Sequence, residues 1–290
     1  MNPQPNSNVR IGLPKGRMQQ NVIALLAGAG ITLRHGAREY RPALSLDGFE
    51  VKILKPQNII EMLAAGSRDI GFAGADWVAE LQADLVELLD TGMDSVRLVA
   101  AAPDSLLEDG RLPRRPLVIA SEYRRLTSEW IERRGCGDSF VRSYGATEVF
   151  PPEDADAITD ITSTGSTLAA NGLAIADELL TSSTRLFASP TAMDDPAKRD
   201  RIESLVLLLR SVLDARGRVM VEMNVAIEKM DALVGMLPCM REPTVAALHH
   251  NAGYAVKVAV PRRQLPTLIP AIKAVGGTDI VVTELAQIVP

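Results

Sequence analysis

Residues 156–167, with the sequence DAITDITSTGST, combine two aspartates with a loop of hydroxyl side chains around one glycine. Residues 157–161 are apolar enough for a strand, whereas residues 163–167 are too small and too polar for a core. Helix-compatible spacing resumes over residues 168–173. The order strand, loop, helix is typical of anion sites, because the first backbone N–H groups of a helix have no partner within it.

This loop offers several further hydrogen-bond donors, and Gly165 would let its backbone approach a ligand closely. Asp156 and Asp160 would repel a phosphate, so they suit ribose hydroxyls or a magnesium ion better. The combination predicts a site for a phosphorylated sugar. The hydroxyl donors are Ser163, Thr164, Ser166 and Thr167.

A helix cap that binds nothing is the simpler interpretation of the same loop, because Ser, Thr and Gly are common there. The segment also lacks the Gly-Lys-Ser/Thr of a Walker loop and the Gly-x-Gly-x-x-Gly of a dinucleotide site. ATP hydrolysis and NAD chemistry are therefore not the expected functions.

Cations follow two other expected strands. Lys15, Gly16 and Arg17 come after a strand at residues 9–13, and Lys55 comes after a strand at residues 50–54. In open α/β sheets, ligands bind at the carboxyl ends of the strands, so these side chains are candidate phosphate contacts. A solvated basic turn is the alternative. A further strand and glycine turn occupy residues 69–76, with sequence DIGFAGAD.

Composition excludes several classes of function. The chain has 290 residues, 47% of them hydrophobic and 23% charged, with a formal net charge of −5. Nucleic acid is therefore not expected as the main partner. No apolar run is long enough to cross a membrane, and the first ten residues lack a signal-peptide core. The two cysteines, Cys136 and Cys239, fit a reducing cytoplasm rather than a disulfide framework.

Strands alternating with helices predict an α/β fold with a mostly parallel sheet. We expect two lobes with a cleft, one from residues 1–104 and 189–216, the other from residues 105–188. Residues 217–290 change to a β-α-β-β-α-β order, which is the ferredoxin-like pattern. His249 and His250 fall on its central strands and would face opposite ways, so they are not expected to share a metal.

The ordered set of motifs resembles one family over nearly the whole chain, the long form of ATP phosphoribosyltransferase. The resemblance implies a two-lobed catalytic part like a periplasmic binding protein, followed by an ACT-like regulatory domain. It also implies that N1 of ATP attacks C1 of phosphoribosyl pyrophosphate in the first step of histidine biosynthesis. The motifs are PKGR at 14–17, KPQ at 55–57, DIG at 69–71, GAD at 74–76, GATE at 145–148, residues 156–167 and NGL at 171–173.

The resemblance also implies roles for individual residues. The loop at residues 163–167 would hold the 5-phosphate and Asp160 the ribose hydroxyls, with Asp156 a second candidate. Glu148 would make a polar contact near the reacting carbon, and no residue is required as a general base. Magnesium would bind mainly through the substrate, near Asp156 and Asp160. The contacts to ATP or pyrophosphate would come from Lys15, Gly16, Arg17, Lys55, Asp69 and Gly71.

Histidine as an inhibitor and a homo-oligomer, from dimer to hexamer, are further expectations from the resemblance. Thr244 in Glu-Pro-Thr would be the effector contact, although the family pattern there is Ser-Pro-Thr. Asn58 and the pair Arg124–Arg125 also depart from the family pattern, and the pair puts the inter-lobe loop in doubt. Two alternatives remain open: a solute-binding protein that catalyses nothing, and a catalytically silent regulatory homologue.

Overall fold

The computed structural model describes residues 8–34, 40–238 and 242–289. Cys239 therefore lies outside the described residues. The chain forms two compact units. The first unit contains the described residues of Met1–Ala24 together with Ile31–Glu203, and the C-terminal unit contains Leu25–Gly30 and the described part of Ser204–Pro290. The expected three-way division, with a boundary between two catalytic lobes, stays a prediction.

The first unit is built on one eight-stranded sheet in the order β4-β1-β5-β10-β6-β9-β7-β8. At one end β4, β1 and β5 are parallel, and at the other end β9, β7 and β8 are parallel. The strands are β1 (Val9–Pro14), β4 (Phe49–Leu54), β5 (Ile70–Gly74), β6 (Val86–Pro103), β7 (Val118–Ser121), β8 (Ser139–Arg142), β9 (Ala157–Thr162) and β10 (Leu173–Ala188). A small hairpin adds β2 (Leu33–Arg34) and β3 (Ala43–Leu44).

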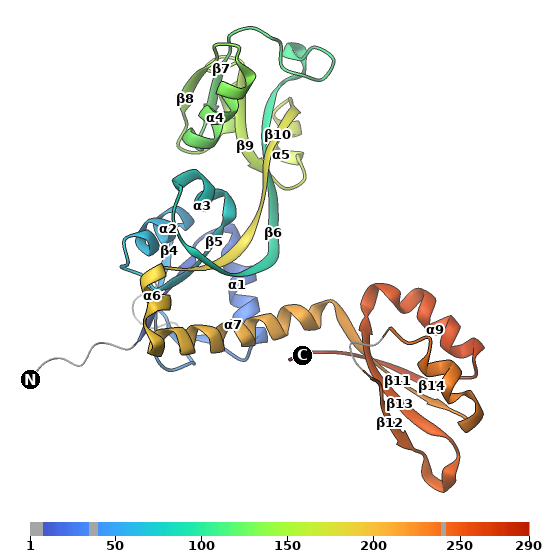
Figure 1. Ribbon diagram of the computed structural model, residues 1–290. Coiled ribbons are helices and arrows are strands. Elements are labelled where there is room, and N and C mark those ends of the chain that lie inside the picture. The colour runs from blue at the N-terminus through green and yellow to red at the C-terminus, as the bar shows by residue number, and fades with distance from the viewer. Residues whose placement is uncertain (1–7, 35–39, 239–241, 290) are drawn as a thin grey trace, which may run out of the picture. The chain divides into compact units, whose positions relative to one another are not determined.

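The expectation of a mostly parallel sheet is wrong at the centre. β6 and β10 are long antiparallel strands of 18 and 16 residues that run side by side between the two parallel ends (Figure 1). β10 also pairs antiparallel with β5, and β6 with β9. The sequence obscures β10, because its middle residues are polar and its register with β6 shifts at several points. Only residues 185–188 are recognisable as a strand from the apolar pattern.

Helices follow most of the parallel strands and bury apolar residues against them. Strand β5 is buried along its whole length, and Ile59, Ile60 and Leu63 of α2 are fully buried beside it. Burial of such side chains is the main contribution to folding, at about 1.5–3 kcal/mol each. The helices are α1 (Arg17–Gly28), α2 (Pro56–Ala64), α3 (Ala75–Leu81), α4 (Arg124–Arg134), α5 (Ser166–Ala170), α6 (Pro190–Asp194) and α7 (Pro196–Arg216).

The C-terminal unit confirms the ferredoxin-like order. Its sheet, β12-β13-β11-β14, is antiparallel throughout. Alternate residues of β11 are buried, as expected for a strand covered on one face. The first helix is shorter than expected, a 3₁₀ turn at Ile227–Lys229 followed by α8. The elements are β11 (Arg218–Val225), α8 (Met230–Val234), β12 (Thr244–Ala247), β13 (Tyr254–Pro261), α9 (Leu265–Ala274) and β14 (Thr278–Glu284).

The two histidines are not on strands as expected. β12 ends at Ala247, and His249 and His250 occupy a 3₁₀ turn, His249–Asn251, before β13. His250 has a positive φ of 58°, a conformation that ends a strand rather than extending it.

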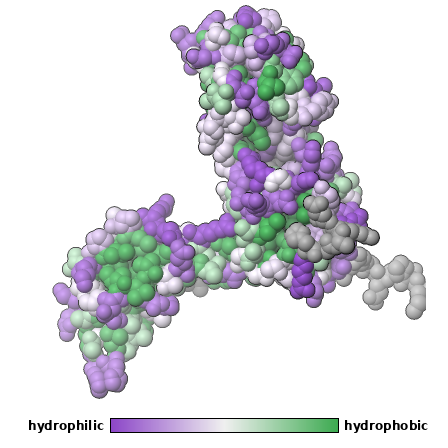
Figure 2. All heavy atoms as spheres, turned by 180° about the vertical axis from the view of Figure 1, so that it is seen from behind, coloured by the Kyte–Doolittle hydropathy of each residue, from purple (hydrophilic) through white to green (hydrophobic). Residues whose placement is uncertain are grey.

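Hydrophobic surface gathers in one area of the C-terminal unit (Figure 2). The exposed apolar side chains of this unit include Val245, Val281 and Val282 on the edge strands β12 and β14. Edge strands with exposed apolar residues are suited to pairing with other chains. Within the described residues, no helix is long and apolar enough to span a membrane.

Candidate functional site

A cavity of about 340 Å³ lies beside the loop that joins β9 to α5. We call residues 163–167 the hydroxyl loop. Its members Ser163, Thr164, Ser166 and Thr167 all line the cavity, so the structure brings the predicted donors together. Arg17, Glu148 and Asp160 line the same cavity from other elements. One cation, two carboxylates and several hydroxyl donors therefore face a common space.

Gly165 determines the shape of the hydroxyl loop. Its φ of 82° is left-handed, which glycine adopts without the strain that a Cβ would cause. Its backbone N–H donates to the Thr162 Oγ1 at 2.9 Å. Thr164 Oγ1 donates to Ser166 Oγ at 2.9 Å and accepts from the Ser166 N–H at 3.3 Å. The loop is thus held by its own side chains, while its hydroxyls stay exposed to a ligand.

A second cavity, of about 210 Å³, shares Arg17, Asp160 and Ile161 with the first. It lies where several strands end, as expected for a ligand site in an α/β sheet. The second cavity is wide enough for a small ligand group and presents both charged and aromatic side chains. Its other lining residues include Lys15, Gln57, Asp76, Trp77, Asp94, Glu122, Tyr123 and Ser182 to Thr184.

Asp160 connects the two cavities and is electrostatically perturbed. Burial, together with the negative charges of Glu148 and Glu122, raises the pKa of Asp160 to about 6, although its hydrogen bond from the Ile161 N–H opposes the rise. That N–H lies 2.7 Å from the Asp160 Oδ1. A raised pKa here means that the ionised carboxylate lacks a sufficient positive counter-charge. A cation or a developing positive charge would supply one.

Glu148 reaches the site from a 3₁₀ turn, Thr147–Val149, which a buried hydrogen bond anchors. The hydroxyls of Ser143 and Thr147 lie 2.7 Å apart, and both residues are buried. Glu148 itself is half-buried and lines the first cavity beside Asp160. The structure therefore supports its selection as a polar contact, and its role stays a prediction.

Lys15 and Arg17 flank the start of α1, as predicted. Both line the second cavity, and Arg17 lines the first as well. The ammonium group of Lys15 donates to the Tyr40 hydroxyl at 2.9 Å. Gly16 between them has a φ of 91°, which only glycine adopts easily. Lys55 is exposed as the N-terminal flanking residue of α2, and its neighbours Pro56 and Gln57, rather than Lys55, line the second cavity.

Asp156 does not join the site. It precedes β9, whereas the hydroxyl loop follows it, and a six-residue strand separates its ends by about 20 Å. The Oδ2 of Asp156 accepts the Val118 N–H at 2.7 Å, and the Asp156 N–H donates to the Val118 carbonyl at 2.9 Å. Asp156 therefore fixes β9 beside β7, and we withdraw it as a ribose or metal contact.

Asp69 has the same structural role in the other half of the sheet. Its Oδ2 accepts the Arg10 N–H at 2.7 Å, and its own N–H donates to the Arg10 carbonyl at 2.8 Å. Its carboxylate also pairs with the guanidinium of Arg10 and the ammonium of Lys198, at 2.8 and 2.9 Å. Burial alone would raise the pKa of Asp69, but these hydrogen bonds hold it below its ordinary value. Asp69 is thus outside the cavities.

Gly71 also has a packing role rather than a lining role. A Cβ built there would lie 2.4 Å from the Ile59 Cγ2 and 3.3 Å from the Gly12 carbonyl oxygen. The glycine therefore allows α2 to pack directly on β5. Neither Asp69 nor Gly71 supports the predicted contact with a nucleotide.

A buried polar network, which the sequence motifs do not indicate, closes one side of the second cavity. The Tyr123 hydroxyl donates to the Asp76 Oδ2 at 2.6 Å, and the Ser182 hydroxyl donates to the Asp76 Oδ1 at 2.5 Å. Burial and the Asp76 carboxylate raise the pKa of Tyr123, so its hydroxyl remains a donor. Tyr123 stacks on Trp77 with ring centroids 4.6 Å apart.

The start of α4 is capped by a side chain from α3. Both oxygens of Glu80 accept backbone N–H groups, from Arg125 at 2.9 Å and from Leu126 at 3.0 Å. The Arg125 side chain in turn donates to the carbonyls of Ala79 and Glu80. We call this reciprocal contact the α3–α4 clamp. It gives a structural role to Arg125, where the family resemblance predicts a different residue.

A metal cage made by the protein alone is absent from the described residues, in which no three His, Cys, Asp or Glu side chains converge. The donor set beside the hydroxyl loop nevertheless fits magnesium held partly by a substrate. Magnesium keeps several waters and is bound by one or two carboxylates plus substrate phosphates. Asp160, with Glu148 beside it, is the candidate carboxylate.

Several lining residues were missed for identifiable reasons. Ser182, Ser183 and Thr184 belong to the polar part of β10 that does not look like a strand. Asp76 and Trp77 follow the glycine turn at residue 74, and this turn was the available signal. Thr244 is exposed on the edge strand β12 of the C-terminal unit, and its contact with an effector stays a prediction.

Comparisons with known proteins point to one family. A family model described as ATP phosphoribosyltransferase matches residues 55–211, and one described as the HisG C-terminal domain matches residues 215–287. An ATP phosphoribosyltransferase of Chlorobium phaeovibrioides is 37% identical over 282 residues, covering 95% of this chain and 96% of the relative. One of Pelotomaculum thermopropionicum is 36% identical over 293 residues, covering 97% and 99%.

A solved structure gives the same result. The ATP phosphoribosyl transferase (HisG:HisZ) complex from Thermotoga maritima aligns with a TM-score of 0.63 at 25% identity, covering 71% of this chain and 98% of that one. The family model over residues 55–211 and the relatives matched over nearly their full length lead to one conclusion. The chain belongs to the ATP phosphoribosyltransferase family.

Proposed function

We propose that the protein transfers the phosphoribosyl group of phosphoribosyl pyrophosphate to N1 of ATP, as the first step of histidine biosynthesis. The observation that supports this most directly is the sharing of Arg17 and Asp160 by two cavities. One cavity has donors for a phosphate, and the other has room for part of a second substrate. A transferase needs two adjacent substrates in this arrangement.

In this proposal the hydroxyl loop holds the 5-phosphate through hydroxyl and backbone donors. Asp160, at the end of β9 next to the loop, accepts hydrogen bonds from the ribose hydroxyls. Lys15 and Arg17, on the other side of the shared space, meet the phosphates of ATP or of the departing pyrophosphate. Lys55 and Gly16 remain candidates for further contacts with these phosphates, Lys55 through its ammonium group and Gly16 through its backbone N–H.

The reaction forms a bond between N1 of adenine and C1 of the ribose. The lone pair of N1 makes this bond, while the C1–O bond breaks and its electron pair leaves with pyrophosphate. Positive charge develops at C1 as the leaving group departs, and negative charge grows on the pyrophosphate. Asp160 and Glu148 face the first charge, and Arg17 faces the second, so fixed charges stabilise both ends of the transition state.

Magnesium would bind between Asp160, with Glu148 beside it, and the oxygens of phosphoribosyl pyrophosphate. When bound, it neutralises charge on the leaving pyrophosphate. The raised pKa of Asp160, about 6, supports the placement, because a divalent cation would offset the repulsion from Glu148 and Glu122.

Histidine inhibition and a homo-oligomer, from dimer to hexamer, also belong to the proposal. The separate ferredoxin-like sheet and its exposed edge valines support a role for the C-terminal unit in assembly and effector binding. Thr244 is the candidate histidine contact. Because ATP and phosphoribosyl pyrophosphate are intracellular metabolites, we place the activity in the cytoplasm.

The test is the absorbance of purified protein with ATP, phosphoribosyl pyrophosphate and magnesium, with pyrophosphatase added to remove the product. Formation of phosphoribosyl-ATP that depends on both substrates would support the proposal. Suppression by histidine, and its loss in Thr244→Ala, would support the effector site. Absence of turnover by folded wild-type protein would overturn the catalytic proposal and favour a binding or regulatory protein.

A further inference from the structure

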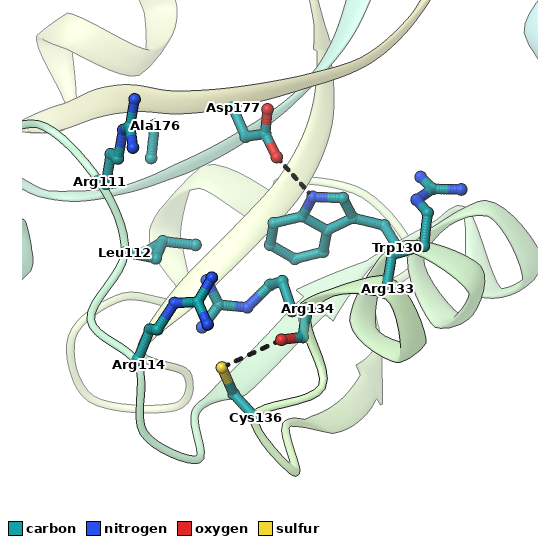
Figure 3. A pocket seen from close by; sticks show the side chains of 9 residues that line it. All are labelled: Arg111, Leu112, Arg114, Trp130, Arg133, Arg134, Cys136, Ala176 and Asp177. Carbon is teal, nitrogen blue, oxygen red and sulfur yellow. Dashed lines mark hydrogen bonds between the residues drawn. The ribbon is translucent and has the colours of Figure 1, made fainter.

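A third cavity lies in the first unit and shares no lining residue with the two described above. Its volume is about 560 Å³, within the range of small-molecule sites. Four arginines line it, and we call it the arginine cavity (Figure 3). Arg111 and Arg114 come from the segment between β6 and β7, and Arg133 and Arg134 come from the end of α4.

A rigid framework holds one of these arginines. The Nε of Arg134 donates to the Asp138 Oδ2 at 2.6 Å, and its Nη2 donates to the Pro113 carbonyl at 3.0 Å. Its guanidinium also covers the ring of Trp130, 5.4 Å from the centroid. Because a guanidinium carries five N–H donors, Arg134 retains donors for a ligand while its orientation is fixed.

Two carboxylates near the arginines, Asp138 and Asp177, are held by hydrogen bonds within the same framework. The Oδ1 of Asp138 accepts the Leu117 N–H at 3.0 Å, and its Oδ2 accepts Arg134. The two oxygens of Asp177 accept the Trp130 indole N–H at 2.8 Å and the Glu178 N–H at 2.9 Å. Each oxygen thus has a partner in the framework, and two carboxylates beside four arginines leave the cavity with an excess of positive charge.

Among the residues that the structure describes, no carboxylate forms an ion pair with Arg111, Arg114 or Arg133. The carbonyl end of α4 accounts for cations at Arg133 and Arg134, since the helix dipole favours them there. It does not account for Arg111 and Arg114, which come from a different segment and line the same space. Like charges gathered around a concave surface repel one another until an anion joins them.

We propose that the arginine cavity binds a small anion with several phosphate charges, such as pyrophosphate or the polyphosphate of a nucleotide. Guanidinium groups from two segments can hold phosphate oxygens in paired hydrogen bonds. Recognition is of phosphate rather than of a base, because Trp130 is only 4% exposed and Arg134 covers its ring. This site is separate from the site of the proposed reaction and does not depend on that reaction.

Cys136 provides a local reporter of occupancy, because it lines the arginine cavity and is half-buried. The only other cysteine is residue 239, so Cys239→Ser leaves a single thiol. In that background, the rate at which neutral iodoacetamide alkylates Cys136 is measured against the concentration of sodium pyrophosphate, ATP or adenosine. We expect pyrophosphate and ATP to slow alkylation several-fold at saturation, and adenosine to have no effect.

The double variant Arg114→Glu/Arg133→Glu tests which residues cause the protection. It should raise the pyrophosphate concentration needed for protection by at least about tenfold, because two charge-assisted contacts are lost. The matched control is Arg115→Glu, which makes the same charge change at an exposed arginine outside the cavity. Arg115→Glu should leave the pyrophosphate concentration needed for protection unchanged.

Calorimetric titration with pyrophosphate gives a second readout that does not need the thiol. The wild type should contain one more binding site per chain than the double variant, and Arg115→Glu should retain that site. Equal numbers of sites in the wild type and the double variant would overturn the proposal. Protection by adenosine, or pyrophosphate protection that survives the double substitution, would also overturn it. The turnover assay for the proposed reaction is independent of all three results.

Discussion

Replacement of Asp160 by asparagine should make the free protein more stable at neutral pH and its activity lower. The pKa of this carboxyl is about 6 in the folded protein, against an ordinary value of 3.8. The folded state therefore binds the proton more tightly than the unfolded chain. Below pH 3.8 both states are mostly protonated, and the site carries no penalty. Between pH 3.8 and about 6 the unfolded chain ionises while the folded protein keeps its proton, so stability falls across this range and stays lower above pH 6.

The difference between the two pKa values corresponds to at most about 3 kcal/mol, at 1.36 kcal/mol for each pKa unit. Residual solvent contact reduces this figure, so we expect Asp160→Asn to gain about 2 kcal/mol above pH 6. For a chain of this size that corresponds to a rise in melting temperature of about 4–8 °C. Near pH 4 the wild type and the variant should melt at similar temperatures.

The assay is calorimetric melting of both proteins from pH 4 to pH 8, without substrates. Asp154→Asn is the matched control, because it removes an exposed carboxylate of the same segment that lies outside the described cavities. It should show no gain that follows pH in this way. An Asp160→Asn variant that is less stable than the wild type at pH 8, or whose gain does not depend on pH, would refute the electrostatic reasoning.

Kinetics of the same variant complete the argument. In the proposed function Asp160 holds ribose hydroxyls and faces the developing positive charge. Its replacement should lower kcat/KM for phosphoribosyl pyrophosphate by at least about tenfold, which corresponds to about 1.4 kcal/mol. A variant that is both more stable and fully active would show that the charge of Asp160 is not needed for catalysis.

Further substitutions test the loop, the sheet and the clamp. Thr164→Val should lower kcat/KM for phosphoribosyl pyrophosphate by at least about tenfold with only a small fall in melting temperature, since the exposed hydroxyl makes only two hydrogen bonds within the loop. Unchanged kinetics would remove the hydroxyl loop from the site. Asp69→Asn should destabilise the protein by about 3 kcal/mol in denaturant titrations, because Arg10 and Lys198 lose their counter-charge. The folded variant should retain the wild-type KM. The destabilisation should shrink as the pH falls through the lowered pKa of Asp69. Glu80→Ala should cost about 1 kcal/mol through the lost cap of α4, measured by the same titrations, and no loss would show that water replaces the cap.

The parts of the site built from local sequence were predictable. The hydroxyl loop, Lys15 and Arg17 follow apolar strands directly, and the end of a strand in an α/β sheet is where ligands bind. Asp160 could be selected because it lies only a few residues before the loop. Glu148 was also predictable from its glycine turn. That its carboxylate lines the same cavity as the Asp160 carboxylate could be seen only from the fold.

The parts that depend on long-range pairing were not predictable. Asp69 and Asp156 look like ligand carboxylates in sequence, yet each accepts a backbone N–H from a neighbouring strand at the amino ends of the strands, away from the cavities. β10 was largely missed because a strand with shifted register and polar residues on both faces has no simple period of two. For the same reason, Ser182 to Thr184 were not predicted to line the site.

The long pair β6 and β10 has a consequence for how the first unit can change shape. The two parallel ends of its sheet are joined by continuous hydrogen-bonded strands, so they cannot rotate about a free peptide linker. Bending must concentrate where the ladder is already irregular, and one such irregularity falls between Ser182 and Thr184, which line the second cavity. A molecule that bound in the second cavity would therefore contact the same stretch of backbone at which the sheet can bend, and its binding would restrict that bending.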